Sequence, residues 1–206
     1  MAQPSGTLRA SLPVDFAVTY LAPLIAEFAE LYPGINFEFD LTPRKVDLIS
    51  EPSDVAIRMG EPENSQLIAR KVASLTAFLY ASPEYLERSG TPSVPSERED
   101  HECVGMLKIN SWTLHHGKET QTVNVSGRFA LNNVGMIRRL ATLHQGTMLM
   151  PKEVVADELA TGSLVQVLPD WHGSPRAVYA LTETRLIPAK VQRFIDFLRE
   201  RLSHHD

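Results

Sequence analysis

Over the first 60 residues of the chain, segments with apolar residues at every second position alternate with segments in which they recur at helical spacing. In "INFEFDL" (35–41), apolar side chains occupy every other position, which is typical of a half-buried strand. Elsewhere apolar residues recur at helical spacing, and the Tyr-Pro-Gly turn at 32–34 ends one such stretch. The pattern predicts strand 7–13, helix 21–31, strand 35–41, helix 44–51 and strand 54–57. This order favours parallel strands joined by right-handed crossovers.

Pro23 lies inside the first predicted helix and leaves two possibilities open. Proline is tolerated in the first turn of a helix, whereas in the interior it kinks the helix. Either the regular helix begins near Pro23 or an earlier turn is kinked there.

The rest of the chain continues as a second α/β unit, which begins near residues 72–75. One helix carries complete end signals, with Ser82 as its cap, Pro83 at its first position and Gly90 past its end. The polar, Pro/Ser-rich stretch 91–102 is predicted to be a connecting loop. The other expected elements are strands 75–81, 103–107, 122–131, 147–150, 163–168 and 177–181, and helices 132–146, 151–162 and 188–202. The pattern does not settle whether the last helix belongs to the second unit or returns to the first.

Composition excludes several classes of function for this chain. The net charge of −5 argues against nucleic-acid binding by this chain, because that function usually requires a basic face. Cys103 is the only cysteine, which excludes an internal disulfide and a cysteine cluster for metal and fits a reducing compartment. The N-terminal residues lack the apolar core of a signal peptide, and no apolar run approaches a membrane span. We therefore expect a soluble, cytoplasmic protein with no membrane contact.

Sequence motifs for catalysis, metal binding and phosphate binding are absent. There is no Gly-x-Gly-x-x-Gly, Gly-x-Ser-x-Gly or His-Glu-x-x-His. His115 and His116 are adjacent, so on a strand they point to opposite faces and are not expected to share a metal. His101 lies two residues from Cys103, but nothing else supports an activated thiol, and a small buried thiol is the favoured interpretation. We expect no catalytic residues, no metal and no cofactor.

Loops at the carboxyl ends of the strands are the remaining candidates for a binding site. In open α/β sheets, ligands bind beyond these ends, where loops meet helix N-termini. Helix N-termini and Arg or Lys side chains there favour an anion such as a carboxylate. The candidate effector-binding residues are Pro13, Val14, Asp15, Phe16, Thr42, Pro43, Arg58, Gly60, Lys108, Ile109, Asn132, Asn133 and Thr147. If the two units face each other, these residues line one cleft.

Arg58 carries the sharpest question, because it ends the otherwise apolar strand "DVAI". One hypothesis is that its guanidinium faces an anionic ligand at the strand end. The alternative is an ordinary ion pair with a nearby acid such as Glu61. The residues alone leave both open.

From about Gly6 to Leu202, the chain resembles the C-terminal effector-binding domain of LysR-type transcriptional regulators. The segments that carry the resemblance, in order, are "GTLRASLP" (6–13), "LAPLIAEFAELYPGI" (21–35), "VDLISEPSDVAIRMG" (46–60), "SQLIARKV" (65–72), "YASPEYLERSGTP" (80–92), "HECV" (101–104), "GSLVQVLPDW" (162–171) and "PAKVQRFIDFLRERL" (188–202). The resemblance implies an α/β fold of the type 2 periplasmic-binding-protein kind, with two Rossmann-like lobes joined by two crossover strands. Lobe I would comprise 6–74 and 181–202, and lobe II 75–180, so the last helix would return to lobe I.

The same resemblance implies a function and partners. A small effector, anionic or aromatic, would bind in the cleft between the lobes and change how an attached module binds DNA. The family's N-terminal winged helix-turn-helix and linker helix have no counterpart in this sequence, so we expect an excised domain that reaches DNA only through the missing module. A homodimer or homotetramer is implied, with helix 21–31 as a candidate dimer face.

Three places depart from the family's usual pattern: "QGTMLMP" (145–151), "ALTETR" (180–185) and Glu51-Pro52. They leave the identity of the effector open. A transport-type solute-binding protein of the same fold is the main alternative, and a secretory leader upstream of Gly6 would distinguish it from a regulator. An enzyme on this fold is a third class, which the turnover of a bound ligand would reveal.

Overall fold

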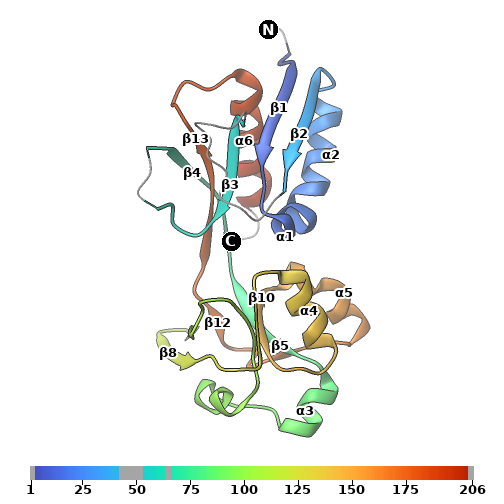
Figure 1. Ribbon diagram of the computed structural model, residues 1–206, viewed down its shortest axis with the longest axis vertical. Coiled ribbons are helices and arrows are strands. Elements are labelled where there is room, and N and C mark those ends of the chain that lie inside the picture. The colour runs from blue at the N-terminus through green and yellow to red at the C-terminus, as the bar shows by residue number, and fades with distance from the viewer. Residues whose placement is uncertain (1–2, 42–52, 64–65, 204–206) are drawn as a thin grey trace. The chain divides into compact units, whose positions relative to one another are not determined.

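The computed structural model describes residues 3–41, 53–63 and 66–203. Contacts divide the chain into two units, each compact (Figure 1). Unit 1 is formed by two segments, Met1–Leu75 and Arg176–Asp206, and unit 2 is the continuous segment Thr76–Pro175. The sequence-based boundary at 74/75 differs from the observed one by a single residue, whereas the boundary at 180/181 lies five residues beyond Pro175. Residues 176–180 belong to unit 1 because they pair with strands of its sheet.

Unit 1 is built on a five-stranded sheet with the order β2-β1-β3-β13-β4. Its strands are β1 (Gly6–Ser11), β2 (Ile35–Asp40), β3 (Val55–Met59), β4 (Ile68–Leu75) and β13 (Arg176–Thr182). β1 is parallel to both β2 and β3, which confirms the predicted parallel arrangement. β13 runs antiparallel to β3 and β4 and lies between them. β4 was not predicted from the sequence. The helix expected over 44–51 lies outside the described residues.

The helix that follows β1 shows how Pro23 is accommodated. The chain enters α1 (Val14–Phe16), continues through a π-helical segment (Ala17–Leu21) and then forms α2 (Ala22–Leu31). Pro23 lies in the first turn of α2, where a missing backbone N–H costs little. The first of the two possibilities is therefore confirmed: the regular α-helix begins beside Pro23.

An aromatic cluster around Phe28 forms the centre of the unit 1 core. Phe28 is fully buried, and its ring lies 5.3 Å from the rings of both Phe194 and Phe197 and 6.2 Å from that of Phe37. Phe194 and Phe197 belong to α6 (Ala189–Leu202), which packs on the sheet beside α2. The C-terminal helix thus belongs to unit 1, which settles the question that the hydrophobic pattern left open.

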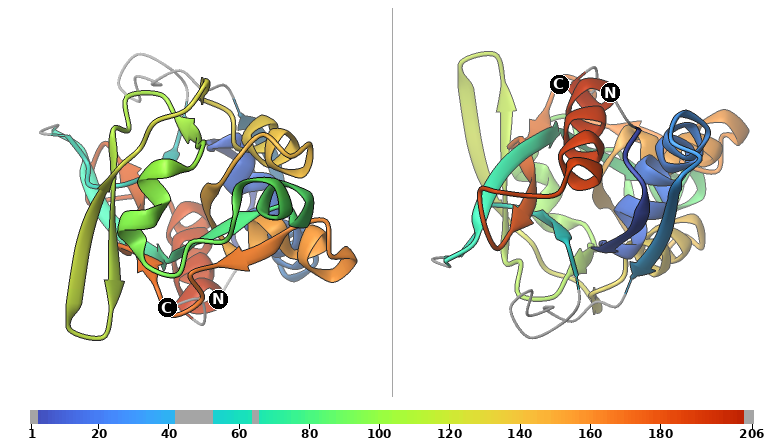
Figure 2. Two further views of the ribbon diagram at one scale, coloured as in Figure 1. Left: turned by 90° about the horizontal axis from the view of Figure 1, so that it is seen from below. Right: turned by 90° about the horizontal axis from the view of Figure 1, so that it is seen from above.

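Unit 2 contains three small sheets with the orders β10-β5-β11, β12-β7-β8 and β6-β9. Its strands are β5 (Ala77–Ala81), β6 (Val104–Met106), β7 (Ser111–His116), β8 (Glu119–Asn124), β9 (Phe129–Leu131), β10 (Met148–Pro151), β11 (Val165–Val167) and β12 (His172–Gly173). Its α-helices are α3 (Pro83–Ser89), α4 (Val134–Thr142) and α5 (Ala156–Thr161). β7 and β8 form a hairpin that extends from the rest of this unit (Figure 2).

The stretch 91–102, which the sequence predicts to be a polar connecting loop, is packed into unit 2. It contains a 3₁₀ helix (Pro95–Asp100), and the side chain of Arg98 is fully buried. The guanidinium carbon lies 4.5 Å from the ring centre of Trp112, and Nη1 donates a hydrogen bond of 3.1 Å to the carbonyl of Asn124. The segment connects α3 to β6 as predicted, but polar composition does not reveal an arginine that stacks on a buried aromatic ring.

Candidate functional site

Three polar residues meet at the carboxyl edge of the unit 1 sheet. Ser11 ends β1 and Asp40 ends β2, and the two are register partners. Arg58, from β3, reaches the same edge. Its Nη2 donates a hydrogen bond to Ser11 Oγ at 2.8 Å. Its Nη1 donates to the carbonyl of Ser11 at 3.3 Å and to the carbonyl of the preceding residue, Ile57, at 2.6 Å. A half-buried guanidinium is therefore held over the end of β1.

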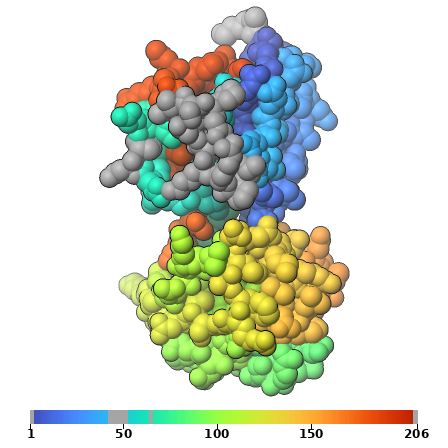
Figure 3. Space-filling view, viewed as in Figure 1, coloured from blue at the N-terminus to red at the C-terminus, as the bar shows by residue number. Residues whose placement is uncertain are grey.

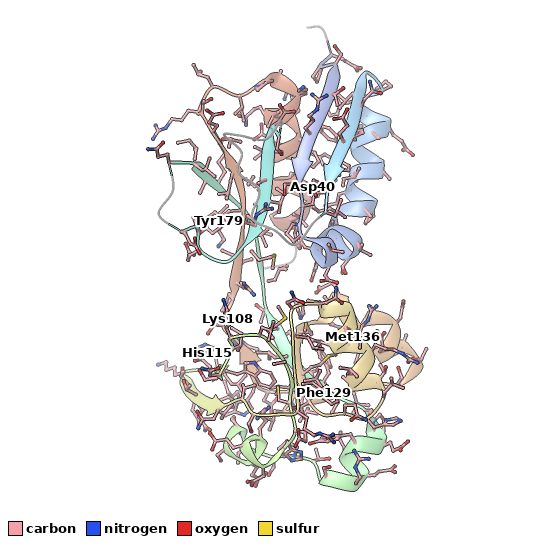
Figure 4. The ribbon with its side chains drawn as sticks, in the orientation of Figure 1. Asp40, Lys108, His115, Phe129, Met136 and Tyr179 are labelled. Atoms are coloured by element: carbon pink, nitrogen blue, oxygen red, sulfur yellow. The ribbon has the colours of Figure 1, made fainter. Side chains whose placement is uncertain are left out.

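The electrostatics of Arg58 follow from this position. Partial burial lowers the pKa of its guanidinium, and the nearby Asp40 carboxylate acts in the opposite direction. An arginine remains protonated at neutral pH despite such a shift. The suggested partner, Glu61, instead accepts hydrogen bonds from the hydroxyl of Tyr179, at 3.0 Å to each carboxylate oxygen. Asp40 and Tyr179 are labelled in Figure 4. The contacts described for Arg58 thus favour the strand-end site over the Glu61 ion pair.

The helix start beside Arg58 contributes backbone groups. Pro13 precedes α1 with extended backbone angles and, as the residue at the N-cap position, makes no capping side-chain hydrogen bond. The first turn of a helix directs backbone N–H groups outward, and these attract anions. Val14 is exposed, whereas Phe16 is buried and stacks on Tyr20 at 5.0 Å. Phe16 therefore fixes the helix start from the core side, and only its backbone lies at the edge.

Of the unit 1 candidates that follow β2 and β3 in the chain, only Gly60 lies among the described residues. Thr42 and Pro43 lie outside the described residues. Gly60 has a φ of +82°, and its N–H donates to the carbonyl of Ala177 at 2.7 Å. A residue with a Cβ is strained at this φ, so Gly60 shapes the turn after β3 through its backbone.

The second group of candidates lies at the carboxyl edge of the β6–β9 pair in unit 2. β6 and β9 are parallel, so their carboxyl ends lie at the same edge. Lys108 follows β6 in a tight turn, with a φ of +66°, and Leu107 N–H donates to the carbonyl of Leu131 at 2.8 Å. After β9, Asn133 caps α4, since its Oδ1 accepts from the N–H of Met136 at 2.8 Å. The turn and the helix start are neighbours at the surface of unit 2 (Figure 3).

Exposed apolar side chains accompany these polar groups. Leu107 and Met136 are each 50 % exposed and Ile109 is 45 % exposed, so this part of unit 2 presents large apolar side chains to solvent. Lys108 and Met136 are labelled in Figure 4, as is Phe129, which begins β9 and so lies at the end of that strand away from this edge. Sequence reasoning named Ile109 but missed Leu107 and Met136. Their position, directly after a strand and in the first turn of a helix, was the available signal.

Asn132 is exposed just before this cap, whereas Thr147 lies elsewhere. Thr147 is fully buried at the amino end of β10, and its backbone bridges that of Cys103, before the start of β6. Its Oγ1 donates to the carbonyl of Glu102 at 3.2 Å. The structure therefore does not bring Thr147 to the edge that carries Lys108, and its hydroxyl serves the fold.

The cysteine and its neighbouring histidine do not form a catalytic pair. Cys103 is buried, and burial raises the pKa of its thiol to about 11, so it is protonated at neutral pH. His101 instead shares a hydrogen bond of 3.0 Å between its Nδ1 and the hydroxyl of Tyr85. Over the described part of the chain, no three His, Cys, Asp or Glu residues lie close enough together to hold a metal ion.

This α/β fold, with polar groups at the carboxyl ends of parallel strands, defines a ligand-binding domain of the type 2 periplasmic-binding-protein-like class. The chain belongs to the LysR substrate binding domain family, whose model matches residues 1–203. None of the described helices is long and apolar enough to cross a membrane.

Individual relatives agree with this assignment. The chain is 33 % identical over 206 residues to the HTH-type transcriptional regulator PtxR of Pseudomonas aeruginosa and 32 % identical over 210 residues to an HTH-type transcriptional regulator of Xanthomonas campestris pv. campestris. These matches cover 97 % of this chain but only 65 % and 60 % of the relatives, respectively. The chain thus spans less than two thirds of the length of either regulator.

Solved structures show the same fold. The regulatory domain of CrgA, a LysR-type transcriptional regulator from Neisseria meningitidis, superposes with a TM-score of 0.83 at 28 % identity, covering 97 % of this chain and all of that one. The full-length virulence activator AphB of Vibrio cholerae gives a TM-score of 0.81 at 32 % identity, covering 97 % of this chain and 70 % of AphB.

Proposed function

We propose that this chain is the effector-binding part of a LysR-type transcriptional regulator and that its effector is a small organic anion. The observation that carries the proposal is the guanidinium of Arg58, held by Ser11 at the carboxyl edge of the unit 1 sheet. The start of α1, where Pro13 offers no capping side chain, lies at the same edge, because β1 leads directly into it. A cation and outward backbone N–H groups together suit a carboxylate.

Unit 2, taken by itself, also carries features that suit a small molecule. Lys108 is exposed between Leu107 and Ile109 in the sequence, and Met136 is exposed in the first turn of α4. Small-molecule sites are mostly apolar, with a few polar groups that fix orientation. We therefore expect an effector with an apolar or aromatic body.

Regulation follows from differential binding. An effector changes the activity of a regulator only if it binds one arrangement of the protein more tightly than another. We propose that the attached DNA-binding module, present in the relatives named as HTH-type regulators, responds to that shift in the cytoplasm. Assembly as a homodimer or homotetramer through α2 remains a prediction.

A ligand screen tests the anion site. Small aliphatic and aromatic carboxylates are added to the purified chain, and a binder raises the melting temperature by mass action. Arg58→Ala should weaken a confirmed carboxylate ligand by roughly tenfold or more, because a charge-assisted hydrogen bond contributes on the order of 1.5–3 kcal/mol. Arg9→Ala is the matched control, since Arg9 lies on β1 in the same unit but forms an exposed ion pair with Glu38. Equal affinity of the Arg58→Ala and wild-type proteins would falsify the role of Arg58.

Two other classes of protein, a transport-type solute-binding protein and an enzyme, can be distinguished from a regulator. The transport-type alternative receives no support from the relatives, which are transcriptional regulators. Chromatography of a confirmed ligand after prolonged incubation with the protein should recover it unchanged. Recovery of a product would instead indicate an enzyme.

A further inference from the structure

Two histidines that are 57 positions apart in the sequence face each other across two strands of unit 2. His115 on β7 and His172 on β12 are register partners in an antiparallel pair. Residues directly opposite in such a pair project from the same face of the sheet. Their imidazole rings lie 5.6 Å apart, centre to centre, at an interplanar angle of 32°. Figure 4 labels His115, on the β7–β8 hairpin.

The hydrogen bonds of His172 leave one ring nitrogen suited to a metal. Its Nδ1 lies 2.9 Å from the carbonyl oxygen of Gly173. A carbonyl can only accept, so Nδ1 carries the proton and Nε2 carries the lone pair. Metal-binding histidines commonly hold their second nitrogen in this way, by donating it to a backbone carbonyl.

His115 has a compatible environment. Its Nδ1 is 3.1 Å from Thr120 Oγ1, and its Nε2 is 2.8 Å from Ser174 Oγ. Hydroxyls both donate and accept, so Nδ1 can donate to Thr120 while Nε2 presents its lone pair. Ser174 Oγ, now bonded to that lone pair, is displaced by a metal or remains beside it as an oxygen group.

From this geometry we propose that His115 and His172 form a two-imidazole site for a divalent transition-metal ion. Imidazole ligands suit Cu²⁺, Ni²⁺ and Zn²⁺. No third His, Cys, Asp or Glu completes the set within the described segments, so water fills the remaining positions. Structural zinc sites use four protein ligands, so this site binds more weakly than those and exchanges its metal.

The site has a consequence for the chain around it. His172 lies three residues before Pro175, where unit 2 ends and the chain enters β13. β12 contains only two residues, so its attachment to β7 depends on few hydrogen bonds. A metal held by both histidines joins β12 to β7 and stabilises the folded state of unit 2.

The experiment uses the full chain with His204 and His205 replaced by Ser, which removes the histidine pair of the C-terminus. NiCl₂, CuCl₂ and ZnCl₂ are titrated separately by isothermal calorimetry at neutral pH, with EDTA added afterwards to reverse binding. In this background, His172→Ala should weaken binding by tenfold or more. His116→Ala should leave it unchanged, because His116 lies on the same strand but packs on Trp171, with its ring centre 5.4 Å from that of Trp171.

Two further variants keep the result interpretable. His172→Phe preserves a ring beside Phe78 and replaces His172→Ala if the alanine variant does not fold. His115→Gln should lose binding to the same extent as the His172 variant. The proposal is overturned if the background protein binds none of the three ions, if removal of His172 leaves affinity unchanged, or if His116→Ala weakens binding equally.

Discussion

At the scale of single residues, two arginines show how position decides the role of a charge. Arg58 is half-buried at a strand end and donates to Ser11, so its charge faces the candidate ligand edge. Arg98 is fully buried, and within the described structure its Nε and Nη2 have no hydrogen-bond partner. It is held by the hydrogen bond from Nη1 to the Asn124 carbonyl and by the ring of Trp112, which is a packing contact as much as an electrostatic one.

Two variants of Arg98 separate its charge from its packing. Arg98→Ala should lower the free energy of unfolding by about 2–5 kcal/mol, because it leaves a cavity beside Trp112. Arg98→Met should stay within about 1 kcal/mol of the wild type, because it fills most of that space without a buried charge. Urea denaturation followed by circular dichroism measures both. A methionine variant as unstable as the alanine variant would show that the charge itself is required.

The pH dependence of stability should carry a contribution from His101. Burial, reinforced by the nearby positive charge of Arg98, lowers its pKa in the folded protein from the ordinary value of 6.5, against the opposing effect of Asp100 and Glu97. The unfolded chain therefore binds the proton more readily, so stability is highest above the unfolded pKa and falls as pH decreases through it. Protonation would also oppose the Tyr85 hydroxyl, which accepts from Glu102 N–H and so donates to Nδ1.

His101→Asn tests this assignment, because an amide oxygen can accept from Tyr85 but does not titrate. The loss of unfolding free energy between about pH 7 and about pH 5 should be smaller in the variant than in the wild type. Urea titrations at both pH values measure the difference. An equal loss of unfolding free energy in the variant and the wild type would mean that other groups account for the acid sensitivity.

At the scale of elements, the ends of helices were predicted more accurately than the packing of loops. Ser82, Pro83 and Gly90 delimit α3 as expected, since capping and backbone restrictions are local. The burial of Arg98 in the connecting stretch 91–102 and strand β4 were missed, because both depend on partners outside their own segments. Strand-end reasoning grouped Lys108, Asn133 and Thr147. In the structure Lys108 and Asn133 follow the parallel strands β6 and β9, whereas Thr147 pairs with Cys103 before β6.

The cap of α3 gives a prediction at this scale. Ser82 is buried, its Oγ accepts from the N–H of Tyr85 at 3.2 Å, and the same oxygen is 2.9 Å from His144 Nδ1. Ser82→Ala should therefore cost about 1–2 kcal/mol of stability, the upper part of the usual range for a cap. Thermal unfolding measures it, and Ser82→Thr, which keeps the hydroxyl, is the control. A loss below about 0.5 kcal/mol would mean that water replaces the cap.

At the scale of the whole molecule, the two units differ in how the chain builds them. Unit 2 is one continuous segment with its own apolar clusters, and both tryptophans are in it. Unit 1 needs two segments, because β13 and α6 complete a sheet and core begun by residues 1–75. Removing the second segment leaves β3 and β4 without the strand that joins them.

This difference predicts the behaviour of fragments. A fragment of residues 76–175 should fold on its own and show a cooperative change in tryptophan fluorescence on denaturation. A fragment of residues 1–75 should remain unfolded, because it lacks β13 and the α6 residues around Phe28. Circular dichroism and denaturant titration of each fragment measure this. A cooperative transition in the 1–75 fragment would contradict the interdependence of the two segments.

The sequence by itself determined the α/β class, the parallel pairing of the first strands, the family and the limits of α2, α3 and α6, because these depend on local periodicity and on end signals. It overestimated α4 and α5, which are shorter than the predicted 132–146 and 151–162. Tertiary structure alone decided that Arg58 donates a hydrogen bond to Ser11 and that Arg98 stacks on Trp112. It also decided that His115, and not the adjacent His116, is the register partner of His172. Each of these contacts joins residues far apart along the chain. Their proximity follows from strand register and core packing, which no local pattern encodes.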